Sequence, residues 1–175
     1  MAKIIKKVYH QFGSSIMELM VSLFVIAMGL VSVLSLITQN LQAQYINKNV
    51  LIASQLTQEC FELVRNVRDQ NKLLYGYSWD QDIVNDGTYT IDYTGRSGIN
   101  SSVNDISDSG AKLYFDNNGF YSHTVTASST VFSRLVTIRN YPAYTDFLDV
   151  ECKVRWQERG RNHDYLAETY LYDWR

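Results

Sequence analysis

The sequence predicts an α+β protein in which one long N-terminal helix packs on a C-terminal antiparallel β-sheet. Three observations predict this fold class. An uninterrupted apolar stretch lies near the start of the chain, an amphipathic helical pattern follows it, and the remainder alternates between short β-type runs and turn residues. At 175 residues, the chain has room for one ordinary domain and one appendage.

The N-terminal apolar stretch has the properties of a membrane-spanning helix. Residues 19–37 include no charged side chain, and a stretch of this length can cross a ~30 Å hydrocarbon core. Lys3, Lys6 and Lys7 precede the stretch, whereas the next basic residue downstream is Lys48. Because basic residues favour the cytoplasmic side, we expect the N-terminus in the cytoplasm and the C-terminal domain outside the cytoplasmic membrane.

Two ordinary interpretations of this stretch are a cleaved secretory signal and a signal anchor. The apolar run is long for a secretory signal, and residues 35–40 offer no clear small-residue cleavage site. A signal anchor leaves Glu18 unexplained, because this carboxylate stands at the edge of the apolar stretch behind Gly13. Ionisable groups in membrane segments are usually functional, so we expect Glu18 to meet a cation supplied by a partner chain.

The segment GSSIMELMVSLFVIAMGL, which begins at Gly13, resembles the signal of type IV prepilins: a basic leader ends in Gly, and Glu is the fifth residue after it. The resemblance implies that prepilin peptidase cleaves between Gly13 and Ser14, that Ser14 becomes the N-methylated mature terminus, and that Glu18 directs subunit assembly. The chain departs from the family at Ser14, where Phe or another apolar residue is usual. In a filament, the new α-amino group of Ser14 would pair with Glu18 of a neighbouring subunit in a low-dielectric core.

The helical pattern continues beyond the apolar stretch. Apolar residues recur at steps of three and four, with polar residues between them, and no proline interrupts them. We therefore expect a leader peptide at residues 1–13 and one helix over residues 14–71, on the order of 85 Å long. Its transmembrane or filament-core segment spans residues 16–37. The apolar stripe of its second half consists of Ile46, Val50, Ala53, Leu56, Cys60, Val64 and Val67.

Residues 72–175 predict the extracytoplasmic antiparallel sheet. The β-type runs are Thr88–Tyr93, Lys112–Phe115, Phe120–Thr124, Phe132–Asn140, Phe147–Gln157 and Tyr165–Tyr172. Asn118-Gly119 and Gly160 mark hairpin turns, because Gly and Asn tolerate positive φ. In the run FLDVECKVRWQ, alternation places Leu148 and Val150 toward the core and Asp149 toward water.

The chain has two cysteines, Cys60 and Cys152. Cys60 lies on the apolar stripe of the expected helix, and Cys152 lies on the inward face of the expected strand. A helix-to-sheet disulfide fits this placement, since export makes oxidation possible. A pair of buried, reduced thiols fits it as well.

No catalytic, metal-binding or cofactor-binding pattern is present, so we do not expect an enzyme. His10, His123 and His163 lie outside any metal or nucleophile motif, and no Gly-rich phosphate loop is visible. The formal net charge is −2, and basic and acidic residues are mixed along the sheet region. This balance gives no basic footprint for nucleic acid.

Taken with the resemblance, these features favour a structural subunit, either a minor pilin or a pseudopilin of type II secretion. Its expected partners are other pilins or pseudopilins, prepilin peptidase, the assembly platform and membrane lipid. We expect a single-pass protein of the cytoplasmic membrane that then enters a pilus or pseudopilus. The alternative is a membrane-anchored extracytoplasmic binding domain that does not polymerise.

Overall fold

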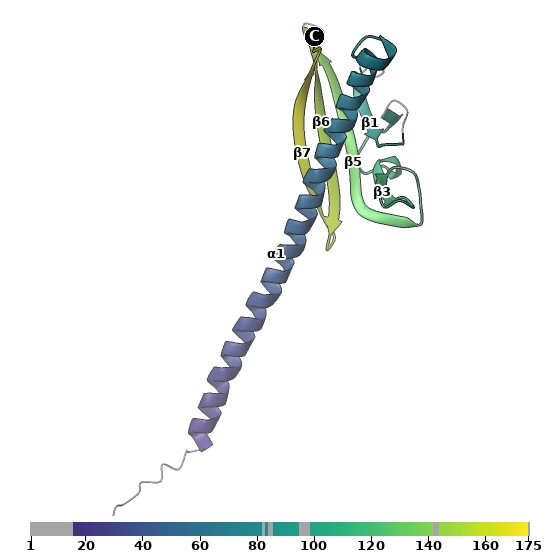
Figure 1. Cartoon of the computed structure of the whole chain (residues 1–175). Helices are drawn as coiled ribbons and strands as arrows, with labels where there is room; N and C mark the ends of the chain where they lie inside the picture. The colour runs from purple at the N-terminus through teal and green to yellow at the C-terminus, as the bar shows by residue number, and fades with distance from the viewer. Residues whose placement is uncertain (1–15, 82, 84–85, 95–98, 142–143, 175) are drawn as a thin grey trace, which may run out of the picture. The chain divides into compact units, whose positions relative to one another are not determined.

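The computed structural model describes residues 16–81, 83, 86–94, 99–141 and 144–174. The chain divides into two compact units, residues 1–46 and residues 47–175. The first unit contains the N-terminal part of helix α1, and the second joins the rest of α1 to a seven-stranded antiparallel sheet (Figure 1). One long helix packed on an antiparallel sheet is the predicted α+β arrangement, and it is consistent with a pilin-like fold.

Helix α1 spans Ile16–Gln70 and leads directly into a π-helical turn, η1, at Asn71–Tyr75. The helix contains no proline, which would remove a main-chain donor and clash with the preceding turn. It ends at Gly76, whose φ of 62° is left-handed and therefore suits a residue without Cβ. The Tyr77 N–H then donates a hydrogen bond to the Asn71 carbonyl at 2.9 Å, which closes the end of the turn.

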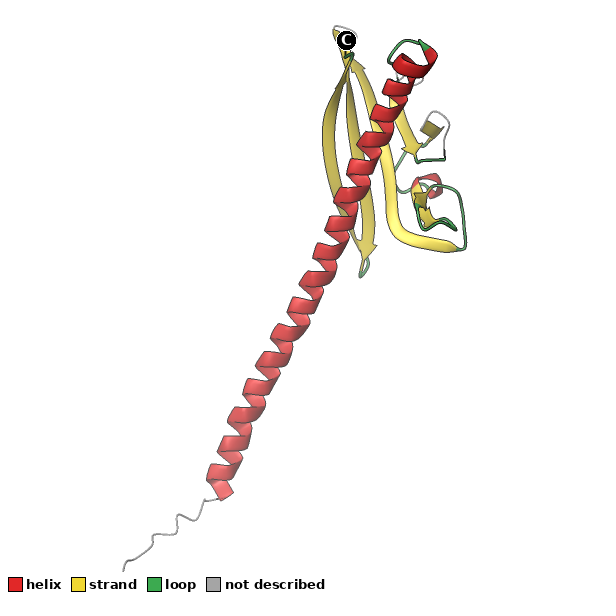
Figure 2. Ribbon diagram, viewed as in Figure 1, coloured by secondary structure: helices red, strands yellow, loops and turns green. Residues whose placement is uncertain are grey.

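The sheet is organised around strand β5. One side of β5 pairs with β6, which in turn pairs with β7. The other side of β5 pairs with β1 and, further along the strand, with β3. Strand β1 pairs with β2, and strand β3 pairs with β4. Figure 2 shows β5, β6 and β7 running alongside the second half of α1. The bounds are β1 Gly87–Ile91, β2 Ile99–Ser102, β3 Lys112–Phe115, β4 Tyr121–Ser122, β5 Ser128–Tyr141, β6 Tyr144–Glu158 and β7 Arg161–Tyr172, with a 3₁₀ turn, η2, at Ser109–Ala111.

Each of the six predicted β-type runs overlaps a strand, and both predicted hairpin turns are confirmed. Gly119 has φ 84°, and its N–H donates to the Asp116 carbonyl between β3 and β4. Arg159 and Gly160 form the two-residue turn between β6 and β7, with φ values of 50° and 78°. Two consecutive positive values match the twist of a tight hairpin, and Gly160 adopts its value without steric strain.

The core of the second unit lies between α1 and the sheet. Five residues of the predicted stripe are buried there: Ala53, Leu56, Cys60, Val64 and Val67. The inward residues of β6 meet them, and all five are at most 2% exposed: Leu148, Val150, Cys152, Val154 and Trp156. Ile46 and Val50 are 38% and 36% exposed, so the covered part of the stripe begins after Val50.

The opposite face of β6 differs from its predicted wet character at one position. Asp149 was expected in water but is only 5% exposed. Arg139 on β5 pairs with it, and the Tyr141 hydroxyl donates to its Oδ2 atom at 3.4 Å. These neighbours cover the carboxylate. The alternation of the sequence therefore predicted correctly on which face of the sheet Asp149 lies, but its predicted exposure to water was wrong.

Candidate functional site

The N-terminal part of α1 presents apolar side chains on all sides. From Ile16 to Ile37 its large apolar residues are between 48% and 79% exposed within the structure. Such a surface is hydrophobic all round, which is typical of a helix surrounded by lipid or by other helices. Among the described residues, α1 with its terminal turn is the helix that is long and apolar enough to cross a membrane.

Two hydroxyls in or directly after this part of the helix are bonded to the helix itself. The Ser32 hydroxyl donates to the Met28 carbonyl at 2.9 Å, and the Thr38 hydroxyl donates to the Ser35 carbonyl at 2.8 Å. Hydroxyls bonded to their own helix need no water, so they are compatible with an apolar environment. The segment fits a single-pass membrane anchor.

Glu18 introduces a carboxyl group into this apolar part of the helix. It lies in the first turn of α1 and is the only charged residue of the helix before Lys48. The positive end of the helix dipole favours a carboxylate at this position. Gly13 and Ser14, the predicted cleavage and methylation positions, lie outside the described residues.

The two predicted cysteines lie together in the helix–sheet core. Cys60 and Cys152 are both 0% exposed, and both are free thiols in this structure. Burial raises the pKa of the Cys152 thiol well above its usual range, and the neighbouring Cys60 thiol raises it further. The Cys152 thiol therefore stays neutral near pH 7 and is a poor nucleophile in the folded chain.

Arg134 is a buried cation that the sequence analysis did not single out. It lies on β5 and is 0% exposed. Its Nη1 donates to the Leu56 carbonyl of α1 at 3.2 Å, and its Nη2 donates to the Ile91 carbonyl of β1 at 2.6 Å. Glu59 of α1 is its ion-pair partner at 3.4 Å. One side chain thus joins the helix to two strands.

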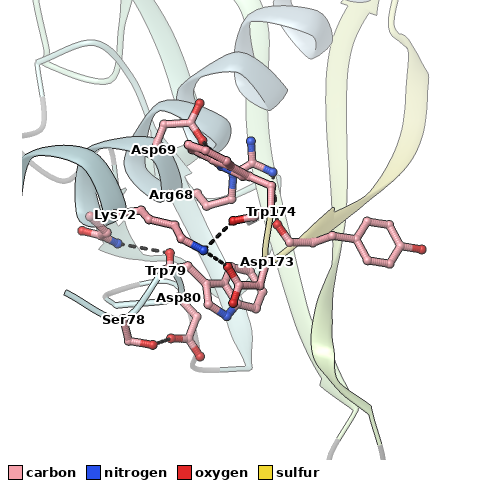
Figure 3. A network of polar contacts seen from close by, with 10 residues as sticks. Arg68, Asp69, Lys72, Ser78, Trp79, Asp80, Asp173 and Trp174 are labelled. Carbon is pink, nitrogen blue, oxygen red and sulfur yellow. Dashed lines mark hydrogen bonds and ion pairs between the residues drawn. The ribbon is translucent and has the colours of Figure 1, made fainter. Parts of the chain in front are cut away.

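A polar clasp joins the C-terminal residues to the end of α1. We define it as Arg68, Asp69, Lys72, Asp173 and Trp174 (Figure 3). Lys72 pairs with Asp173 and donates to the Trp174 carbonyl, while the Trp174 indole N–H donates to Asp69 at 2.9 Å. Arg68 donates to the carbonyl of the last β7 residue at 3.3 Å. The clasp fixes the ends of α1 and β7 to each other.

His123 lies beside the buried end of the β3–β4 hairpin rather than in a ligand cluster. Its main-chain N–H donates to Asp92 at 2.7 Å, and its Nδ1 lies 3.1 Å from the Gly110 carbonyl. Burial, reinforced by the charge of Arg134, lowers the pKa of His123 to about 4. Within the described part of the chain, no group of three or more His, Cys, Asp or Glu residues could hold a metal ion.

The predicted site residues therefore separate into two places. Glu18 lies on the uncovered apolar helix, and Cys60 and Cys152 lie in the helix–sheet core. Arg134 could have been found from sequence, because it shares the inward parity of Phe132, Val136 and Ile138 on the predicted strand. Comparison of the chain with protein-family models, with curated proteins and with solved structures gives no match.

Proposed function

We propose that this chain is a structural subunit, a minor pilin or pseudopilin, that leaves the cytoplasmic membrane and enters a type IV pilus or a type II secretion pseudopilus. The observation that carries the proposal is that the two halves of α1 differ in how far their side chains are covered. Its apolar half is uncovered, whereas its second half forms the core of the sheet unit. A helix that served only as an anchor would need about 20 residues.

The uncovered half supports assembly because its apolar surface needs an apolar environment at every stage. In the membrane, lipid surrounds it. In a filament, the same surface is buried against equivalent helices. Burial there desolvates few polar side chains, namely Glu18 and a few small polar groups. One surface thus serves both stages.

Glu18 supports the choice of a prepilin-type subunit. A carboxylate buried among apolar helices is costly unless a cation pairs with it. Cleavage after Gly13 would create that cation, the α-amino group of Ser14, on each neighbouring subunit. In this proposal, prepilin peptidase makes the cut, methylation occurs on Ser14, and the sheet domain lies outside the membrane.

The test places a photo-reactive benzoyl-phenylalanine at Phe24, which is 63% exposed on the apolar half of α1. The matched control carries the same probe at Phe120, which is 60% exposed on the sheet unit. In cells that hold a prepilin peptidase and an assembly platform, Phe24 should crosslink to a pilin or pseudopilin in sheared surface fractions. N-terminal sequencing should find Ser14 as the first residue.

The same experiment addresses the anchored binding domain, the alternative function. Adducts at Phe24 that contain only lipid, together with an intact N-terminus in the presence of active peptidase, would favour that alternative and reject the filament subunit. A cut beyond Ile37 would instead indicate a secreted domain.

A further inference from the structure

Four aromatic rings surround a small pocket on the sheet face that points away from α1. Tyr141 comes from β5, Phe147 from β6, and Tyr170 and Tyr172 from β7. Phe147 is the central ring: its centroid lies 5.4 Å from Tyr170, 5.7 Å from Tyr172 and 6.0 Å from Tyr141. The Phe147 and Tyr170 rings are perpendicular, at 89°. The rings therefore line an open hollow instead of forming one flat stack.

The register of the sheet explains why these rings meet. Phe147 is directly opposite Tyr172, and Asp149 is directly opposite Tyr170. Residues two apart share a face, so the two tyrosines of β7 stand side by side. The pocket has a volume of about 250 Å³. This is below the roughly 300 to 1,000 Å³ of sites for drug-sized ligands, so it suits a small headgroup.

A buried carboxylate lies next to this pocket. Asp149 accepts a hydrogen bond on Oδ2 from the hydroxyl of Tyr141, one of the four lining rings, at 3.4 Å. Its Oδ1 atom is buried and has no hydrogen-bond partner among the described residues. A quaternary ammonium group has no N–H and cannot donate a hydrogen bond to this atom, so Asp149 contributes its charge alone.

Among the residues that the structure describes, the charges near the pocket are predominantly negative. Arg139 is the described cation of this part of the face, and it already pairs with Asp149 and Glu151. Glu168 is exposed directly opposite Glu151 on β7. The described residues of this part of the face thus include three carboxylates and one guanidinium. The negative faces of aromatic rings add to this potential, and a phenol that donates to a carboxylate gains electron density on its ring.

We propose that the pocket formed by Tyr141, Phe147, Tyr170 and Tyr172 binds a small quaternary ammonium group, with Asp149 supplying the long-range charge. A trimethylammonium group has an apolar surface and a full positive charge, so it matches aromatic walls beside an anionic site. A neutral apolar ligand would match the rings but would gain nothing from the carboxylates. This binding is separate from the proposed assembly of α1 and would persist in a chain that never polymerises.

The test uses the full-length protein in a maltoside detergent, which has no ammonium group. Choline is titrated at pH 7, and saturation transfer from the protein to its N-methyl protons reports occupancy. We expect half-saturation at ~1 mM. The uncharged isostere of choline, 3,3-dimethylbutan-1-ol, should bind about tenfold more weakly because it lacks the cation.

A second titration, with glycerophosphocholine, identifies the source of the ammonium group. Tighter binding than that of choline assigns the site to a lipid headgroup, and weaker binding assigns it to a free solute.

Matched variants separate the pocket from general aromatic surface. Tyr170→Leu and Tyr172→Leu each remove a ring that is 54% exposed, and each should weaken choline binding about threefold to thirtyfold. Phe120→Leu removes an exposed ring after β3 and should leave binding unchanged. Thermal melting checks that all three variants fold. Equal binding of choline and its isostere, no saturable transfer, or unchanged affinity in the two tyrosine variants would overturn the proposal.

Discussion

The Nη1 atom of Arg134 donates a hydrogen bond to the Leu56 carbonyl, 3.2 Å away across the helix–sheet interface. The same side chain has no exposed surface. Burying a cation is costly in free energy. Removing it is more costly once its partners are buried, because their carbonyl and carboxylate oxygens then lose the donor that pairs with them. This asymmetry determines what substitution at residue 134 should do.

We expect Arg134→Met to destabilise the sheet unit by about 3 kcal/mol, since the Ile91 carbonyl loses its charged donor and Glu59 loses its cation. Urea unfolding measures the change. Arg155→Met is the matched control: Arg155 pairs bidentately with Asp164 on a more exposed part of the sheet, so its loss should cost about 1 kcal/mol or less. Equal effects of the two substitutions would contradict a central role for Arg134.

The two core cysteines predict a redox-dependent stability. If the sheet unit is exported into an oxidising compartment, Cys60 and Cys152 should form a disulfide, adding about 2 to 4 kcal/mol. The protein, denatured without reductant and alkylated, is measured by mass spectrometry. Absence of label on both residues supports the bond, and Cys152→Ala should then release Cys60 for labelling. Full labelling of both in exported protein would show that the pair stays reduced.

His123 predicts a loss of stability in mild acid. Its pKa is about 4 in the folded chain and 6.5 in an unfolded one. Because the folded value is the lower one, the contribution to stability is fully present above pH 6.5 and is lost as the pH falls toward 4. The loss should reach about 2 kcal/mol by pH 5.

The measurement is the free energy of unfolding in urea at several values between pH 7 and pH 5. His123→Gln should flatten this pH dependence, since the neutral amide needs no deprotonation. His163→Gln serves as the control, because His163 stacks on Trp156 beside the β6–β7 turn and takes no part in the contacts of His123 with Asp92 and Gly110. An unchanged slope in His123→Gln would assign the acid sensitivity to other groups.

Substitution of Glu18 distinguishes the two proposed functions, a filament subunit and a membrane-anchored binding domain. In the membrane, Glu18→Ala should insert and fold as well as the wild type, since it removes a carboxylate from an apolar helix. In a filament, it would leave the Ser14 amine of a neighbour unpaired, at a cost of about 3 to 5 kcal/mol. The variant should therefore accumulate in membranes, still be cleaved after Gly13, and be depleted from sheared filaments.

The matched control for Glu18 is Glu62→Ala. Glu62 is exposed in the second half of α1, where it pairs with Arg65 one turn away. Such a pair contributes only a few tenths of a kcal/mol, so this variant should assemble normally. Incorporation of Glu18→Ala at the wild-type level would show that this carboxylate does not set the register of a filament.

Strong periodicity made the main elements predictable. The long helix and the β6 strand repeat their apolar residues at the period of their own geometry, so local sequence and burial agree. Strand β2, Ile99–Ser102, was not predicted because its sequence INSS has no alternation; it forms because β1 offers a pairing edge. Likewise β5 begins at Ser128, earlier than its apolar run, where it pairs with β3.

The buried polar residues were harder to predict for a different reason. Strand parity places Arg134 on the inward face, whereas its charge favours exposure to water. The side chain can be buried because it donates hydrogen bonds to the carbonyls of Leu56 and Ile91. Asp149 has outward parity, and its burial depends on Arg139 and Tyr141 of the neighbouring strand β5. The partners of both residues lie on other elements, so a single-strand pattern contains no trace of them.

The clasp between α1 and the C-terminus also constrains the order of folding. Its partners, Lys72 and Asp173, are separated by 101 positions in the chain. A contact of such high sequence separation forms late, after the intervening strands have shortened the loop that it closes. During synthesis the clasp cannot form until Asp173 and Trp174 have emerged from the ribosome, so a chain truncated after Tyr172 would keep the strands described here and lose the contacts that hold the end of β7 to α1.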